Sequence, residues 1–83
     1  MTLVYKEIGK ETYFLTTDEK ERPAKFWVKF AKTHGFSFVY KGFHYYEGKK
    51  YQVVVFSNKL WSEKEIERRR NNGFKGIKRY VCE

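Results

Sequence analysis

Residues 51–57 read YQVVVFS, and this short stretch decides the fold. β-Branched and aromatic side chains fill its centre, and such side chains favour an extended strand. Upstream, residues 36–46 carry an alternating pattern of aromatic side chains, and the EGKK of residues 47–50 is a turn signal. The two segments together predict a β-hairpin, and Gly42 inside the first of them predicts a β-bulge.

On the N-terminal side of this hairpin, residues 24–34 (AKFWVKFAKTH) predict an amphipathic helix. Pro23 suits the first helical position, and Gly35 suits the left-handed residue that ends a helix. Acids at residues 18–21 precede the helix, where they interact favourably with its dipole. The helix carries an apolar stripe of Phe26, Trp27, Phe30 and Ala31, and a basic stripe of Arg22, Lys25, Lys29 and Lys32.

On the C-terminal side of the hairpin, the sequence WSEKEI that begins at Trp61 marks the start of a second helix. Ser62 and Glu65 have the spacing of a capping box, and Trp61 and Ile66 have the spacing of a hydrophobic staple. The helix is expected to run to about Asn72, with three consecutive arginines in its last turns, where they favour the helix dipole.

Three further strands are expected, over residues 2–8, 11–17 and 76–82, and Gly9-Lys10 is placed to join the first two as a hairpin. The predicted order is therefore β-β-α-β-β-α-β. Without its first strand, this is the order of ferredoxin-like, split-βαβ folds. We expect one small α+β domain over residues 1–83, with an antiparallel sheet of four or five strands and both helices on one face.

The composition limits the class of protein. The 83 residues include 18 Lys and Arg against 10 Asp and Glu, which gives a formal net charge of +8. The longest apolar run covers four residues, whereas a membrane span needs about 20, and the first residues do not form a secretory signal. Cys82 is the only cysteine, so it can form neither an internal disulfide nor a thiolate zinc site. We expect a cytoplasmic protein without membrane contact.

The sequence contains no catalytic or metal-binding motif. His34 and His44 are the only histidines, and neither has the spacing of a zinc site or a metalloprotease. His34 is expected to interact with the end of the first helix, whereas His44 lies among the aromatic residues of the hairpin. No glycine-rich phosphate loop is present, and no visible neighbour activates Cys82. We therefore expect no enzyme, no catalytic residue, no metal and no cofactor.

The positive charge is distributed unevenly along the chain. Residues 1–23 have a net charge of −1, residues 24–62 of +6 and residues 63–83 of +3. A run of basic residues indicates a solvated surface as often as it indicates a binding surface. Basic residues interleaved with tyrosines are typical of surfaces that bind phosphates. The leading hypothesis is a small non-enzymatic protein that binds DNA or RNA, with Lys and Arg on phosphates and Tyr stacked on bases. The predicted nucleic-acid-binding residues are Lys25, Lys29, Lys32, Lys41, Tyr45, Tyr46, Lys49, Lys50, Tyr51, Arg68, Arg69, Arg70, Lys75, Lys78 and Arg79.

The element order invites comparison with the RNA-recognition motif, whose third strand carries a basic and aromatic signature. Residues 49–56 match this signature at four of its seven specified positions, and Val53 stands where it has an inner aromatic residue. Tyr51 is retained as a stacking platform, and Tyr13 on the first core strand is expected to lie beside it. The likeness is one of topology, and no family is assigned.

Two other hypotheses remain open. In the first, the chain is a small accessory protein, of a kind found in viruses and mobile elements, that binds and inhibits a host protein such as a nucleic-acid enzyme. The arginines of residues 68–70 beside Tyr80 would then contact an acidic protein surface, because Arg and Tyr dominate such interfaces. In the second, an exposed edge strand, over residues 2–8 or after Gly76, pairs with a second copy to form a homodimer.

Overall fold

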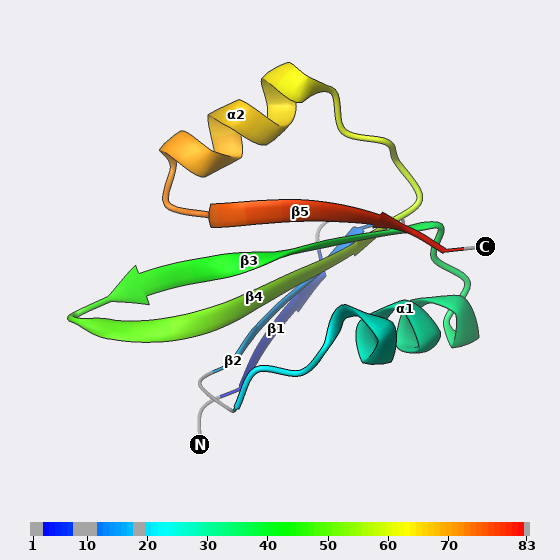
Figure 1. The fold of residues 1–83 in the computed structure, drawn as a ribbon, viewed down its shortest axis with the longest axis horizontal. Coiled ribbons are helices and arrows are strands. Elements are labelled where there is room, and N and C mark those ends of the chain that lie inside the picture. Colours follow the sequence, from blue (N-terminus) through cyan, green and yellow to red (C-terminus); the bar gives the residue numbers. More distant parts are fainter. Residues whose placement is uncertain (1–2, 8–11, 18–19, 83) are drawn as a thin grey trace.

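The computed structural model describes residues 3–7, 12–17 and 20–82, and Figure 1 shows the fold. Every predicted strand and helix is present, with ends within two residues of the prediction. The predicted turn at Gly9-Lys10 and the acids at residues 18 and 19 lie outside the described residues. The elements are β1 (Leu3–Glu7), β2 (Thr12–Thr17), α1 (Ala24–Thr33), β3 (Phe38–Tyr46), β4 (Lys49–Ser57), α2 (Glu63–Asn71) and β5 (Lys75–Val81).

The five strands form one antiparallel sheet in the order β1-β2-β4-β3-β5, so the predicted α+β class is confirmed. The predicted hairpin is present as well, because β3 pairs with β4 over the full length of both strands. Its turn residues Glu47 and Gly48 both have positive φ, at 50° and 77°. Two successive residues of positive φ are typical of the type I′ turns that close two-residue hairpins.

A bulge is present next to Gly42, where β3 pairs with β5, but its extra residue lies on β5 and not at Gly42 as predicted, because β5 advances from Lys78 to Lys75 while β3 advances from Lys41 to Phe43. The register between these strands shifts between Lys41 and Phe43. A Cβ atom at Gly42 would lie 2.5 Å from the Lys75 carbonyl oxygen and 2.5 Å from the ring of Phe74. Such distances are below any van der Waals contact, so the close approach of β5 to β3 requires a glycine at this position.

The two helices cover opposite faces of the sheet, so the expectation that both lie on one face is wrong. Val54 and Phe56 of β4 pack in one core with Trp27 of α1, whereas Val53 packs in another core with Ile66 of α2. Figure 1 shows one helix on each side of the strands. Because β4 is buried on both faces, its apolar run is continuous, whereas a strand with one solvated face would alternate.

The strand order explains the placement of the helices. In the ferredoxin-like arrangement the last strand lies next to the first core strand, but here β5 lies next to β3 at the other edge. The crossover from β2 to β3 passes β4, and the crossover from β4 to β5 passes β3, in the same direction along the sheet. Because β2 and β4 run antiparallel, two crossovers of the usual right-handed sense place their helices on opposite faces.

Each face of the sheet has its own core around a tryptophan. On the α2 side, Trp61 stacks on Tyr40, with ring centroids 4.0 Å apart. The buried Tyr40 hydroxyl donates to the Lys59 carbonyl at 2.9 Å and accepts from the Trp61 backbone N–H at 2.8 Å. On the α1 side, the indole N–H of Trp27 donates to Gln52 Oε1 at 3.0 Å. Both polar groups are satisfied within their cores, as buried polar groups must be.

The helix ends follow local signals with two departures from the prediction. Ser62 Oγ accepts a hydrogen bond from the Glu65 backbone N–H at 3.1 Å, as a capping box requires. The Glu65 carboxylate does not complete the box, because it binds Arg68 and Arg69. Pro23 is the residue before α1, not its first helical residue.

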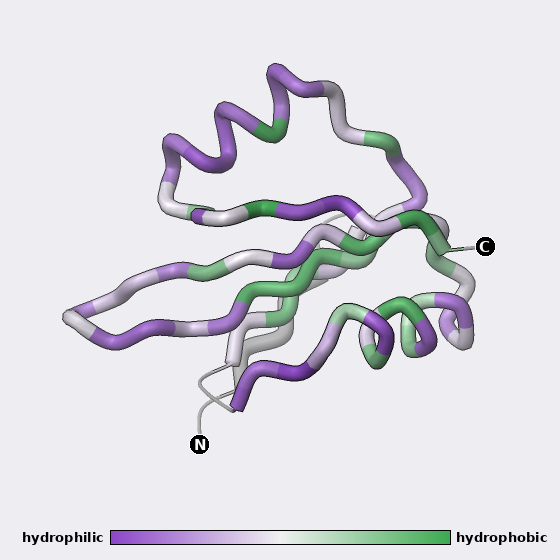
Figure 2. The backbone as a smooth tube through the Cα atoms, in the orientation of Figure 1, coloured by the Kyte–Doolittle hydropathy of each residue, from purple (hydrophilic) through white to green (hydrophobic). Residues whose placement is uncertain are grey.

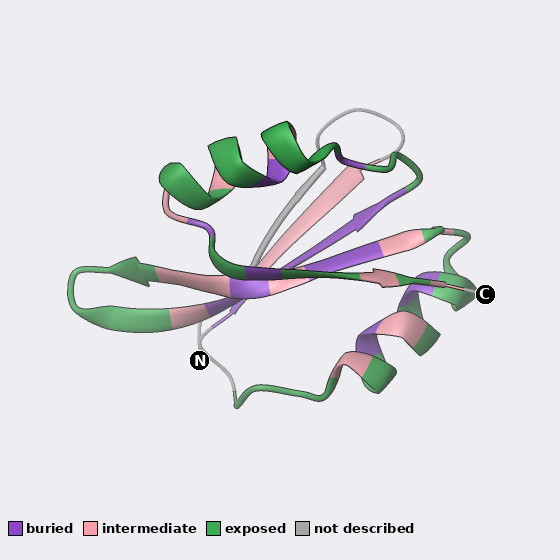
Figure 3. Cartoon of the chain, turned by 45° about the horizontal axis from the view of Figure 1, so that its top comes forward, coloured by how far each residue is buried: buried purple, intermediate pink, exposed green. Residues whose placement is uncertain are grey.

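The β3–β4 hairpin projects beyond the rest of the sheet (Figure 1). The pairing of β2 with β4 ends at Gln52, and the pairing of β5 with β3 ends at Phe43. Among the described residues, residues 44–51 therefore pair only with each other, and we call this part the ribbon. The backbone changes from apolar in the middle of β4 to polar in the ribbon (Figure 2), and from buried to exposed (Figure 3).

Candidate nucleic-acid interface

The predicted basic stripe lies on one flank of α1. The helix buries Trp27 against the sheet and leaves Lys25, Lys29 and Lys32 exposed. Lys32 lies close enough to Cys82, which follows β5, for its charge to act on that thiol. The basic flank is therefore the one nearer β5. In the part of the chain that the structure describes, none of these three lysines forms an ion pair.

The ribbon contributes basic and aromatic side chains to the same side of the sheet. The Nζ of Lys50 lies 3.8 Å from the centre of the Phe43 ring. Phe43 is opposite Gln52 on β4, and the Gln52 side chain binds α1. Tyr45 lies opposite Lys50 and is 53% exposed. Directly opposite residues share a face of the sheet, so Lys50 and Tyr45 lie on the α1 side.

Two more predicted lysines lie on this side where β3 meets β5. Lys41 forms an ion pair with Glu21, in the segment that leads into α1. Lys78 of β5 lies directly opposite Lys41 and therefore shares its face. Together with the flank of α1, these residues form a surface that we call the basic face: Lys25, Lys29, Lys32, Lys41, Lys50 and Lys78.

Glu21 is the acid that forms an ion pair within this surface. The hydrogen bond from Lys41 holds the pKa of the Glu21 carboxyl below its ordinary value, and the charges of Lys41 and Lys50 lower it further. Glu21 is therefore ionised at neutral pH and neutralises part of the charge of the basic face.

The arginines of α2 lie on the other side of the sheet, and two of them share one carboxylate. Glu65 pairs with Arg68 at 2.7 Å and with Arg69 at 3.0 Å, and its pKa is lowered chiefly by the hydrogen bond from Arg68. The guanidinium of Arg69 also lies 4.1 Å from the centre of the Trp61 ring, so this arginine belongs to the packing of α2. Arg70 is exposed.

The structure therefore divides the predicted binding residues between two faces. Tyr80 packs with the α1 core, so the expected contact surface of Tyr80 with the α2 arginines is wrong. Arg79 is opposite Tyr40, which belongs to the α2 core, and it shares that face. Lys75 is exposed at the start of the edge strand β5.

The remaining residues of the ribbon lie on its other face or at its tip. Lys49 places its Nζ 5.7 Å from the centre of the Tyr51 ring, and Tyr46, opposite Lys49, is 59% exposed. Tyr13 lies opposite Phe56, far along β4 from Tyr51. The expectation that Tyr13 lies beside Tyr51 is therefore wrong. The two tyrosines do not form the stacking platform that the comparison with an RNA-recognition motif predicted.

The histidines and the cysteine have structural surroundings. The ring of His34 packs on Phe30, 4.4 Å away, at the end of α1, and His44 Nδ1 lies 3.3 Å from the Gly73 carbonyl oxygen. Burial raises the pKa of the Cys82 thiol, which disfavours the reactive thiolate at neutral pH. Among the described residues, no group of His, Cys, Asp and Glu is arranged to hold a metal ion. No helix within the same residues has the length and apolar character to cross a membrane.

The contribution of Glu21 to the basic face was not predicted from the sequence. The sequence placed this carboxylate only ahead of a helix, where it would interact with the helix dipole, because the sequence neighbours of Glu21 gave no other partner. The partner, Lys41, is 20 residues away and is brought near by the crossover from β2 to β3. Phe43, which lies beside these lysines, was missed for the same reason, and Tyr80 was predicted to lie beside the α2 arginines instead.

Comparison with known proteins adds no functional information. No protein-family model matches the chain, and no curated protein or solved structure matches it either. The function is therefore inferred from the geometry alone.

Proposed function

We propose that the protein is a non-enzymatic nucleic-acid-binding module. In this proposal the basic face binds backbone phosphates and the ribbon contacts bases. The observation that carries the proposal is the flank of α1, where Lys25, Lys29 and Lys32 are exposed without a described ion-pair partner. Like charges spaced in this way destabilise an isolated helix by about 0.2–0.5 kcal/mol per pair, and the bound phosphates of a ligand would relieve that repulsion.

The position of the ribbon supports the proposal. Its exposed Tyr45 and Lys50 lie on the same side of the sheet as the α1 lysines, so one ligand can contact both. The major groove of B-DNA is about 12 Å wide and admits a two-stranded β-ribbon, whereas the major groove of an RNA duplex is too narrow for side chains to read. The ribbon thus favours duplex DNA over duplex RNA.

The test is the salt dependence of binding by a matched pair of triple variants. The first variant, Lys25→Gln, Lys29→Gln and Lys32→Gln, removes three charges from the α1 flank. The second, Lys64→Gln, Arg68→Gln and Arg70→Gln, removes three charges from exposed positions of α2, on the other side of the sheet. Both variants have the same net charge, so a difference between them reports where the ligand binds.

Binding to single- and double-stranded DNA and RNA is measured between about 50 and 200 mM salt, where phosphate binding weakens steeply. The α1 variant should lower the slope of log K against log salt by about 0.7–0.9 for each phosphate that is no longer neutralised, hence by about 2–3 in total. The α2 variant should keep the wild-type slope. Tyr45→Ala should weaken binding by about 1–3 kcal/mol with the slope unchanged, because stacking on bases does not depend on counterion release. Absence of salt-sensitive binding by the wild type to all four ligands would overturn the proposal.

A protein partner is the second candidate, and one observation on the α2 side favours it. A groove of about 460 Å³ is lined by Phe14, Leu60, Trp61 and Arg69, among others. Leu60 in this lining is 61% exposed. Aromatic and arginine side chains are frequent in the centres of protein interfaces. Binding through this groove should change little between the same two salt concentrations and should be abolished in Leu60→Asp but not in the α1 triple variant.

A further inference from the structure

A small cleft in the basic face lies where β3, β5 and the segment before α1 meet. It has a volume of about 140 Å³ and is lined by Glu21, Lys41, Gly42, Phe43, Gly76, Lys78 and Tyr80. About 10–15 Å³ of such volume is enough to hold one water molecule, so the cleft has room for a phosphate group. Two of its lining residues are glycines, so the backbone of β3 and β5 forms part of its floor.

The charges around this cleft are unbalanced. Lys41 and Lys78 lie directly opposite each other on neighbouring strands, an arrangement that is unfavourable for like charges. The Lys41 side chain is only 12% exposed, so water screens its charge poorly. Lys50 is near enough to act on the charge of Glu21. Two ammonium groups therefore line the cleft and a third lies near it, and among the described residues Glu21 supplies the one carboxylate that lines it.

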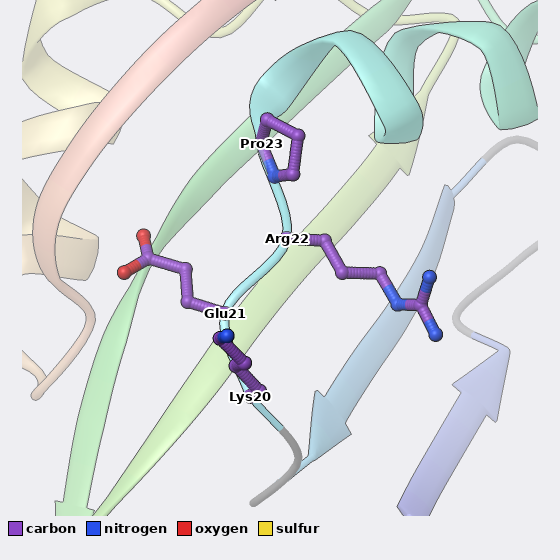
Figure 4. Close-up of a pocket in the computed structure, with 4 residues that line it drawn as sticks. All are labelled: Lys20, Glu21, Arg22 and Pro23. Atoms are coloured by element: carbon purple, nitrogen blue, oxygen red, sulfur yellow. The ribbon is translucent and has the colours of Figure 1, made fainter.

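That carboxylate enters the cleft from a separate segment. Residues 20–23 cross the face of the sheet ahead of α1, and Figure 4 shows Glu21 extending over β3 while Arg22 extends the opposite way, towards β2. The backbone N–H of Arg22 is held by Gln52 Oε1 at 3.4 Å, so the segment is anchored next to Glu21. The Glu21 side chain itself is 49% exposed and can leave Lys41 without disturbing a core.

We propose that this cleft is a phosphate site and that the Glu21 carboxylate occupies it in the free protein. A carboxylate and a phosphate oxygen present the same charged acceptor to a lysine, so a phosphate of the ligand would displace Glu21 and bind Lys41 and Lys78 together. This inference rests on the proposed function for the source of the phosphate, which is the backbone of a nucleic acid. Glu21 then competes with the ligand for the two lysines. It weakens the binding of any anion that contacts this cleft alone.

Glu21→Gln tests the inference, because it removes the charge of the competitor and keeps its shape. The matched control is Glu67→Gln, which makes the same change in net charge at an exposed position of α2 where no described residue forms an ion pair with Glu67. Each variant is titrated with inorganic phosphate while the backbone amides of Gly42 and Gly76 are followed by NMR. The fold of each is checked by the dispersion of the same spectra.

Glu21→Gln should bind inorganic phosphate about two- to fivefold more tightly than the wild type, the range expected for removal of one exposed competing ion pair. Glu67→Gln should match the wild type to within about 1.5-fold. Adding Lys78→Gln to Glu21→Gln should abolish the gain. Equal affinities in Glu21→Gln and Glu67→Gln, or shifts that do not include Gly42 and Gly76, would overturn the inference.

The same variants are then titrated with a short DNA duplex, which separates this inference from the proposed function. A gain in Glu21→Gln for both ligands supports both statements. A gain for inorganic phosphate without duplex binding by any variant supports the phosphate site and overturns the nucleic-acid function. Duplex binding by the wild type without any gain in Glu21→Gln overturns the role of Glu21 and leaves the nucleic-acid function standing.

Discussion

Trp61→Ala is the substitution that tests the packing of α2 on the sheet most directly. Trp61 is 6% exposed and stacks on Tyr40 with the ring planes 12° apart. The guanidinium of Arg69 covers its other side at 4.1 Å. Removal of the indole therefore leaves a cavity between the sheet and α2 that neither neighbour can fill without breaking its own interactions.

The expected destabilisation follows from this burial. Truncation of a buried tryptophan to alanine costs about 3–5 kcal/mol, through the transfer free energy of the indole and the remaining cavity. We expect about 3 kcal/mol, near the low end, because the backbone hydrogen bond from Trp61 to the Tyr40 hydroxyl survives the change. A protein of this length has a total stability of about 4–12 kcal/mol, so the variant should fold but be marginal.

The adjacent residue supplies the control. Leu60 is 61% exposed, so Leu60→Ala should change the free energy of unfolding by less than about 0.5 kcal/mol. Both variants are unfolded in urea with circular dichroism and fluorescence as probes, and the midpoint and slope are compared with the wild type. A destabilisation below about 0.5 kcal/mol for Trp61→Ala, or equal effects in the two variants, would show that α2 does not pack on the sheet through this residue.

Further substitutions test the backbone and the thiol. Gly42→Ala should lower the free energy of unfolding by about 1–3 kcal/mol, because its Cβ would meet the Lys75 carbonyl and the Phe74 ring; an unchanged urea midpoint would contradict this close approach. Glu47→Asn should raise stability by about 0.5–1 kcal/mol, since residue 47 has a φ of 50° and asparagine tolerates this conformation in type I′ turns; a lower midpoint would argue against that turn. Cys82→Ser should keep fold and binding, and Cys82 should be alkylated at pH 7 more slowly than free cysteine, because burial raises its pKa and the thiolate forms only at higher pH; fast alkylation would reveal an activating neighbour.

The elements were predictable from the sequence because their signals are local. The capping residue Ser62, the turn glycine at position 48 and the apolar run of β4 each act within a few residues of their own position. Hydrophobic periodicity and turn chemistry are local properties of this kind. They identify strands, helices and turns, but they say nothing about which strand lies next to which.

The placement of α2 depends on information that is not local. The same element order is compatible with β5 beside β2 or with β5 beside β3, and only the second of these puts α2 on the far face. One signal for the second was present: the continuous VVVF of β4 has no polar alternation, which is typical of a strand covered on both faces. The ion pair of Glu21 with Lys41 had no such signal, because its two residues come together only through the crossover.

If the protein binds duplex DNA as proposed, the geometry of the ribbon links the tyrosines to the lysines in one binding mode. The ribbon has three residues per strand before its turn, which at about 3.4 Å per residue gives a reach of about 10 Å. The major groove of B-DNA is about 8.5 Å deep, so the tip can reach base edges before the ends of β2 and β5 meet the backbone of the duplex. In this mode Lys50 enters the groove with the tip, whereas Lys41 lies about 7 Å behind Phe43, where the pairing of β5 with β3 ends, and would contact only the backbone outside the groove.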